Sequence, residues 1–157
     1  MELWTDVDWG DIASVLIHLG VAYALALPVA WDREIHARSA GLRTFPLVAS
    51  ATCGYMLVAR ALFGEGTEAQ ARVLEGLVAG VGFIGGGAIL RTRGTVQGTA
   101  TAAALWSTGA IGVAVAADRF EIALALGITT FLTFLVFARL KHQLGQEDRD
   151  KRPDDPL

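Results

Sequence analysis

The stretch IASVLIHLGVAYALALPVAW, residues 12–31, contains no Asp, Glu, Lys or Arg. At about 1.5 Å of rise per residue, a helix of this length spans a hydrocarbon core roughly 30 Å thick. Four further apolar stretches follow, over residues 45–63, 73–90, 99–117 and 120–140, and most charged residues lie between them. The sequence therefore predicts an all-α integral membrane protein, a bundle of five transmembrane helices.

The composition agrees with this fold class, since 53% of the 157 residues are hydrophobic and only 18% are charged. We expect a single five-helix transmembrane domain over residues 1–142. Residues 143–157 are too polar to bury, so we expect a charged cytoplasmic tail without fixed structure. The single cysteine, Cys53, excludes an intrachain disulfide.

Lysine and arginine are unevenly divided between the two sets of connecting segments. Ten of the thirteen lie in the first loop, the third loop and the C-terminal region, namely Arg33, Arg38, Arg43, Arg91, Arg93, Arg139, Lys141, Arg149, Lys151 and Arg152. The opposite set holds only Arg60, Arg72 and Arg119. Because cytoplasmic segments carry the excess of these residues, we expect the N-terminus outside and the C-terminus in the cytoplasm.

The third stretch, VLEGLVAGVGFIGGGAIL, is rich in glycine. Its glycines are Gly76, Gly80, Gly82, Gly85, Gly86 and Gly87. Small residues four positions apart let transmembrane helices approach closely, which predicts that this is the central, most crowded helix. Three consecutive glycines also weaken a helix, so a local break at residues 85–87 would present carbonyl oxygens to a cavity or an ion. Both interpretations can hold together.

Two ionisable side chains fall inside the apolar stretches at similar depth. Arg60 lies near the outer end of the second stretch, and Glu75 lies near the outer end of the third. Antiparallel neighbouring helices would bring them together, and charges at membrane depth are usually paired. We expect an ion pair between Arg60 and Glu75.

A polar cluster is expected at the cytoplasmic mouth of the bundle, where four of the helices begin or end. Its members are Asp32, Arg33, Glu34, Arg43, Thr44, Arg91 and Thr101. The carboxylates of Asp32 and Glu34 would form a loose Mg²⁺ site, since hard cations take oxygen ligands. Alternatively they pair with the arginines and fix the loop, or the arginines bind an anionic lipid or a phosphate. These three interpretations stay open.

Three ordered blocks resemble the MgtC/SapB family. The first block is PVAWDRE at 28–34 with AGLRT at 40–44, the second is GVGFIGGGAILR at 80–91, and the third is GTATAAALW at 98–106 with GAIG at 109–112. Together they cover most of the apolar region. The chain departs from the family pattern at Asp32, where Glu is common, and at Pro28, where Gly is common.

The resemblance implies a bacterial inner-membrane, multi-pass protein with a five-helix N-terminal domain. It also implies a link to magnesium homeostasis, namely adaptation to magnesium limitation, and in some bacteria to survival inside host cells. Because the chain ends soon after the fifth stretch, we expect it to lack the soluble cytoplasmic domain of longer family members.

Two functions compete. The protein either binds and regulates a membrane partner during magnesium or acid stress, or it is an oligomeric transporter of a cation, Mg²⁺ or H⁺. We expect no enzyme, since no catalytic motif is present, and no nucleic-acid partner, since the net charge is −3. The expected partners are the lipid bilayer, a membrane protein and further copies of the chain. No cofactor is firmly implied, and Mg²⁺ at Asp32 and Glu34 stays one of the three open interpretations of the polar cluster.

Overall fold

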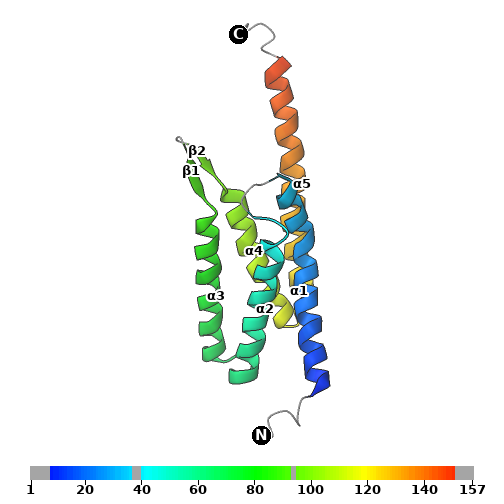
Figure 1. Ribbon diagram of the computed structural model, residues 1–157, viewed down its shortest axis with the longest axis vertical. Helices are drawn as coiled ribbons and strands as arrows, with labels where there is room; N and C mark the ends of the chain where they lie inside the picture. The colour runs from blue at the N-terminus through cyan, green and yellow to red at the C-terminus, as the bar shows by residue number, and fades with distance from the viewer. Residues whose placement is uncertain (1–7, 37–39, 93–94, 151–157) are drawn as a thin grey trace.

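The computed structural model describes residues 8–36, 40–92 and 95–150, and of residues 92 and 138–150 it describes the backbone alone. It forms an elongated helical bundle (Figure 1). The elements are α1 (Trp9–His36), α2 (Thr44–Phe63), α3 (Glu68–Gly87), β1 (Leu90–Thr92), β2 (Thr95–Gln97), α4 (Thr99–Ala116) and α5 (Phe120–Asp150).

Four helices of the described residues, α1, α2, α4 and α5, are long and apolar enough to cross a membrane, by length and composition. The 20-residue α3 is not among them. The helical architecture agrees with the expected fold class. The helix bounds of α2 and α4 lie within one residue of the apolar stretches 45–63 and 99–117.

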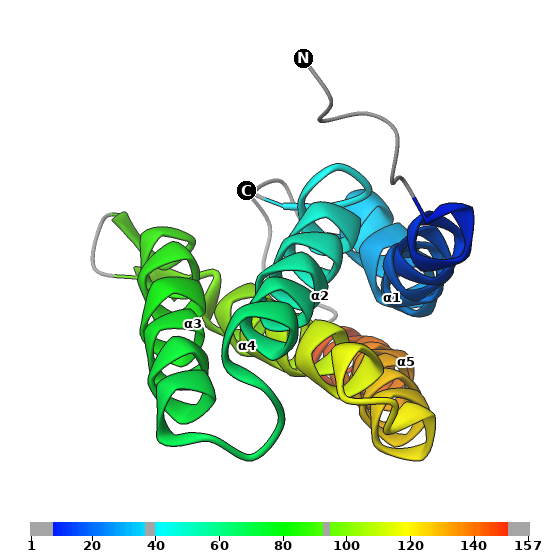
Figure 2. The same cartoon turned by 90° about the horizontal axis from the view of Figure 1, so that it is seen from below.

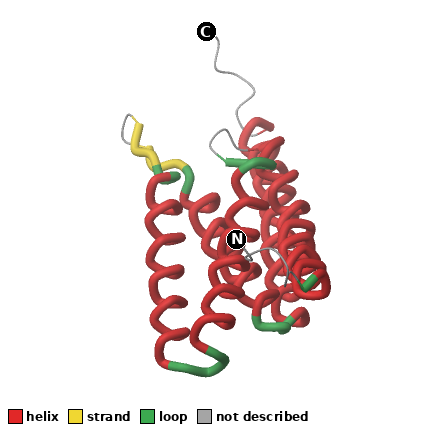
Figure 3. Tube along the Cα trace, turned by 60° about the horizontal axis from the view of Figure 1, so that its bottom comes forward, coloured by secondary structure: helices red, strands yellow, loops and turns green. Residues whose placement is uncertain are grey.

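The bundle has two distinct ends. At the hairpin end, α1 and α3 end, α2 and α4 begin, and α5 continues past them (Figures 1 and 3). At this end β1 also pairs with β2 as an antiparallel hairpin. At the loop end lie the turns from α2 to α3 and from α4 to α5. The hairpin end carries Arg33, Arg43 and Arg91, so it corresponds to the expected cytoplasmic mouth.

Helix α4 lies at the centre of the bundle. It contacts all four other helices, and the view along the bundle shows it between α3 and α5, against α2 (Figure 2). Gly112 makes this packing tight, because a Cβ there would overlap the Ala49 carbonyl oxygen and the Thr52 hydroxyl of α2. The core around it includes Phe45, Leu105 and Ile111, which are fully or almost fully buried.

The expectation that the third apolar stretch forms the central, most crowded helix is wrong. Helix α3 lies at the edge of the bundle (Figure 2), and only Val81 and Gly85 in it are buried. An added Cβ would meet no atom within 4 Å at five glycines of this helix, namely Gly76, Gly80, Gly82, Gly86 and Gly87. Only Gly85 packs closely, with its Cβ position 3.2 Å from the Ala102 carbonyl oxygen of α4. The charged residues of α3 explain this position, because Glu68, Arg72 and Glu75 would be costly in a bundle core.

At residues 85–87, where a break within the helix was expected, the helix instead comes to its end. These glycines form the last turn of α3, and the carbonyl oxygens of Gly85 and Gly86 accept hydrogen bonds from the N–H groups of Ala88 and Ile89 at 3.0 and 3.1 Å. The chain then enters β1, so the stretch predicted over 73–90 is a helix only as far as Gly87. The weak helix propensity of glycine ends the helix rather than interrupting it.

Three helices extend beyond the predicted stretches. Helix α3 begins at Glu68 because the Thr67 side chain caps it, accepting a hydrogen bond from the Gln70 N–H at 3.2 Å. Helix α1 continues past Trp31 to His36, which places Asp32, Arg33 and Glu34 on its last turns.

Helix α5 continues to Asp150, so the expected unstructured tail is wrong for residues 143–150. Gln, Leu, Glu and Arg in this segment are good helix formers, which extend a helix once a buried stretch has nucleated it. Residues 151–157 lie outside the described residues.

Candidate functional site

At the hairpin end, Asp32 is the acidic centre of the predicted cluster. It is only 9% exposed, and its carboxylate accepts a hydrogen bond from Arg33 Nε at 2.9 Å and another from Arg33 Nη2. His36 Nδ1 lies 3.3 Å from the second carboxylate oxygen. The Arg33 guanidinium in turn stacks over the Phe134 ring of α5, with Cζ 3.6 Å from the ring centroid. Asp32 and Arg33 thus fasten the end of α1 to α5.

Glu34 holds a different contact. Its Oε2 accepts a hydrogen bond from the Leu42 N–H at 2.9 Å, which ties the end of α1 to the turn before α2. Gly41 leaves room for this contact, because a Cβ at this position would displace the Glu34 carboxylate and lie 3.0 Å from the Glu34 Cα. The AGLRT segment therefore has a local structural reason for its glycine.

The structure does not bring Asp32 and Glu34 together as a pair of metal ligands. Residues two apart on a helix do not face each other, and each carboxylate is bound by donors of the chain itself. Within the described residues, no group of three or more His, Cys, Asp or Glu side chains is placed to hold a metal ion. Of the three interpretations of this cluster, the contacts favour the pairing network for Asp32, Arg33 and Glu34.

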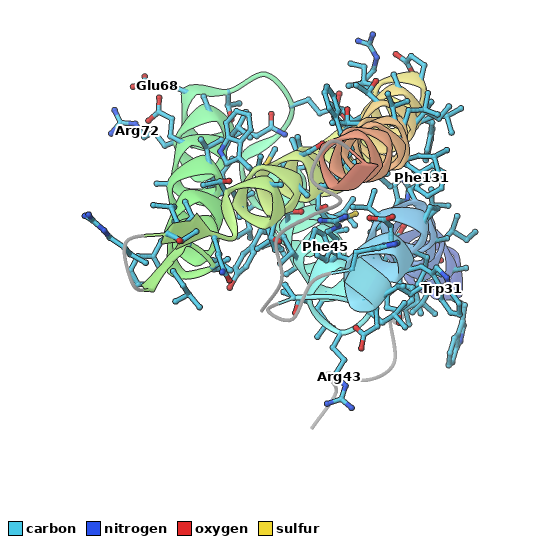
Figure 4. The ribbon with its side chains drawn as sticks, turned by 90° about the horizontal axis from the view of Figure 1, so that it is seen from above. Trp31, Arg43, Phe45, Glu68, Arg72 and Phe131 are labelled. Carbon is cyan, nitrogen blue, oxygen red and sulfur yellow. The ribbon has the colours of Figure 1, made fainter. Side chains whose placement is uncertain are left out.

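The other members of the predicted cluster lie apart from this network. Arg43 precedes α2, is exposed, and extends outward from the bundle (Figure 4). Arg91 is exposed on β1, Thr44 is half-buried, and Thr101 is buried in the first turn of α4. Among the ion pairs between described residues, none involves Arg43 or Arg91. Both arginines are exposed cations at the hairpin end.

The expected ion pair between Arg60 and Glu75 is replaced by another. Arg60 Nη1 donates to Asp118 Oδ2 at 2.7 Å and to the Ala116 carbonyl oxygen, and its Nη2 donates to Glu65. Glu75 is exposed on α3. The reason is the arrangement of the helices, since Arg60 faces the turn between α4 and α5 and α3 lies at the edge of the bundle.

Asp118 is the residue that the sequence reasoning missed. One of its oxygens lies 2.9 Å from His18 Nε2 of α1, while His18 Nδ1 lies 2.7 Å from the Ser14 carbonyl oxygen. Hydrogen bonds from His18 and Arg60 hold the pKa of the Asp118 carboxyl below its ordinary value of 3.8. Asp118 thereby joins α1, α2 and the α4–α5 turn at the loop end.

A local signal for Asp118 exists in the sequence. Asp118 has a positive φ of 57°, a conformation that Asp adopts more readily than most residues. An aspartate in a very short connection between two apolar stretches is typical of such a turn. Its partners, however, depend on which helices become neighbours.

Comparison with known proteins gives the family. The MgtC family model matches residues 19–143. The chain belongs to the MgtC family. It is 31% identical to SrpB of Synechococcus elongatus over 84% of this chain and 79% of SrpB.

Two further relatives have names that refer to magnesium or to the family itself. The chain is 30% identical to YhiD of Escherichia coli, described as a putative magnesium transporter, over 84% of this chain and 64% of YhiD. It is also 30% identical to MgtC of Salmonella typhimurium, over 83% of this chain and 55% of that protein. The chain thus spans about half to four-fifths of the relatives it matches. No solved structure matches it.

Family membership and the apolar helices together identify a membrane protein. Each of the three blocks that carry the family resemblance reaches the hairpin end. The first covers the end of α1 and the start of α2, the second the latter half of α3 with β1, and the third begins at the start of α4. The hairpin end is therefore the candidate functional site.

Proposed function

We propose that this protein is a multi-pass protein of the bacterial inner membrane, in which all five helices cross the bilayer. The N-terminus lies outside and the C-terminus lies in the cytoplasm. The ten-to-three division of lysine and arginine supports this orientation. In it, the hairpin end with Arg33, Arg43 and Arg91 faces the cytoplasm.

The topology is testable with thiol labelling of intact cells. A single cysteine is introduced near each terminus in a Cys53→Ala background, and a membrane-impermeant maleimide is added from outside. The N-terminal cysteine should label in intact cells, and the C-terminal one only after lysis. Labelling of both positions in intact cells would contradict an odd number of crossings.

In this membrane the protein acts during magnesium limitation by binding and regulating a membrane partner, without catalysis. The observation that carries this proposal is that the two carboxylates at the hairpin end already accept hydrogen bonds within the chain. Asp32 and Glu34 bind donors of their own chain and fasten helices to each other, while Gly82 and Gly86, four residues apart on α3, are exposed with open space before them. Small residues at this spacing let a second membrane helix approach closely.

Partner binding is tested by photo-crosslinking in cells that depend on this protein for growth at limiting magnesium. A photoreactive amino acid replaces, one at a time, an exposed residue on three helices: Leu16 of α1, Phe83 of α3 and Phe137 of α5. We expect one face to give a discrete protein adduct that increases when magnesium is limiting. Adducts to lipid alone at all three positions, in variants that still support growth, would contradict the proposal.

A second function, an oligomeric transporter of Mg²⁺ or H⁺, is favoured by the name of YhiD as a putative magnesium transporter. Purified protein in liposomes loaded with a magnesium-sensitive or pH-sensitive dye separates the two functions. The regulatory proposal expects no flux above that of empty liposomes. Flux that the Asp32→Asn, Glu34→Gln double variant abolishes would instead favour transport through the hairpin end.

A further inference from the structure

A groove runs along the outside of the bundle between α2 and α3, with a volume of about 740 Å³. Arg43 and Thr44 line it at the hairpin end, and Tyr55 and Gly76 line it further along. Between them the walls are mostly apolar, formed by residues such as Leu47, Leu77 and Ile84. None of its lining residues is acidic.

The groove exists because the facing side of α3 has no side chains at two positions. Gly76 and Gly80 are four residues apart and both line the groove, and a Cβ on either would meet no atom within 4 Å. An apolar space of this size at the surface of a membrane helix bundle is occupied by hydrocarbon, since an empty cavity forfeits dispersion contacts.

The length of the groove fits one lipid chain rather than a second helix. From Thr44 to Tyr55, α2 rises by roughly 16 Å at 1.5 Å per residue. This is about half of a hydrocarbon core roughly 30 Å thick, and so about the depth of one leaflet. A transmembrane helix from a partner would instead need a groove over the whole thickness.

The charge at the groove mouth selects the headgroup. Arg43 lies at this mouth with an exposed side chain that extends outward from the start of α2 (Figure 4). Arg91 adds a second exposed positive charge on β1, at the same end of the bundle. Arginine binds phosphate oxygens through a planar fork of N–H donors, and basic residues at a membrane surface attract anionic headgroups.

We propose that the α2–α3 groove is a binding site for one anionic phospholipid. An acyl chain lies along Gly76 and Gly80, and the phosphate lies at Arg43. The site does not depend on the proposed regulatory function, and it can be tested on purified protein alone.

The test is native mass spectrometry of the purified protein with added phosphatidylglycerol or phosphatidylcholine. Gly80→Leu fills the groove and should weaken retention of phosphatidylglycerol about tenfold or more. Gly20→Leu is the matched control, because Gly20 is an exposed glycine of α1 whose Cβ would also meet nothing within 4 Å. It should retain lipid as the wild type does.

The headgroup contact is tested with a second pair of variants. Arg43→Gln should lower the preference for phosphatidylglycerol over phosphatidylcholine by about fivefold, the effect expected of one surface arginine. Arg72→Gln removes an exposed arginine near the start of α3, at the loop end, and should leave this preference unchanged.

Three results would overturn the proposal. The first is equal retention of the two lipids by the wild type, and the second is equal lipid retention by Gly80→Leu and Gly20→Leu. The third is a dimer of the wild type that Gly80→Leu dissociates, because a second copy would then occupy the groove.

Discussion

Helices α3 and α4 both carry several glycines, yet they use them in opposite ways. In α4, Gly109 and Gly112 lie against Val81 and against Ala49 with Thr52, and both glycines are buried. In α3, Gly76 and Gly80 face open space. Glycine spacing therefore marks a surface that a helix or a lipid can approach closely, without telling whether the occupant comes from the same chain.

Charge distinguishes the two helices better than glycine content does. Residues 99–117 contain no Asp, Glu, Lys or Arg, and a helix that is apolar on all sides is typically buried. Helix α3 carries Glu68, Arg72 and Glu75, and the Glu68 and Arg72 side chains point away from the bundle (Figure 4). The difference between α3 and α4 leads to four predictions.

The largest effect is expected for Gly112→Val in α4. The new side chain overlaps the Ala49 carbonyl oxygen, which is backbone and cannot turn aside, so we expect a loss of about 2–3 kcal/mol in the free energy of unfolding. Unfolding in detergent micelles measures it. Gly82→Val in α3 is the matched control and should cost far less. Equal losses in the two variants would contradict the central position of α4.

A smaller effect is expected where α4 meets α3. A Cβ at Gly109 would lie 2.9 Å from Val81 Cγ2, so Gly109→Ala and Val81→Ala should be coupled by about 1 kcal/mol. A double-mutant cycle on the free energy of unfolding measures this coupling. Simple additivity would mean that α3 does not pack against α4 at this point.

Gly80→Ala should change the free energy of unfolding in the opposite direction, towards greater stability. Nothing lies within 4 Å of the new Cβ, and alanine favours the helix, so we expect stabilisation by about 0.5–1 kcal/mol. The same unfolding assay in micelles tests it. Destabilisation would show that something packs tightly against this face of α3.

The smallest expected change in stability concerns Asp118, directly after α4, and it appears only at low pH. The pKa of Asp118 is lowered in the folded state, so its contacts with His18 and Arg60 stabilise the protein above pH 3.8. This contribution is lost as the pH falls further, through the folded-state pKa. As the pH falls, the free energy of unfolding should therefore decrease less steeply in Asp118→Asn than in the wild type. Asparagine tolerates the same positive φ.

The control for this prediction lies at the start of α3. Glu68 pairs with Arg72 at 2.6 Å, but both side chains are highly exposed, and such pairs contribute little. Glu68→Gln should keep the wild-type pH profile. If Asp118→Asn also kept it, the contacts of Asp118 would not stabilise the fold.

The sequence was informative where the signal is local. Apolar length gave the bounds of α2 and α4 closely, and Thr67 with Gln70 forms a capping pattern that could have placed the start of α3. Contacts between distant residues were not predictable in this way. Arg33 with Phe134 and Arg60 with Asp118 require knowledge of which helices are neighbours, and the assumption that α3 is central misassigned the partner of Arg60.

The peripheral position of α3 is tested most directly by the oxygen accessibility of spin labels in lipid bilayers. Labels are attached to Gly80→Cys in α3 and to Ala114→Cys in α4, each in a Cys53→Ala background. Residue 80 is exposed and residue 114 is 7% exposed. The label at residue 80 should show high accessibility to lipid-dissolved oxygen and the label at 114 low accessibility. Low accessibility at both positions would contradict the arrangement described above.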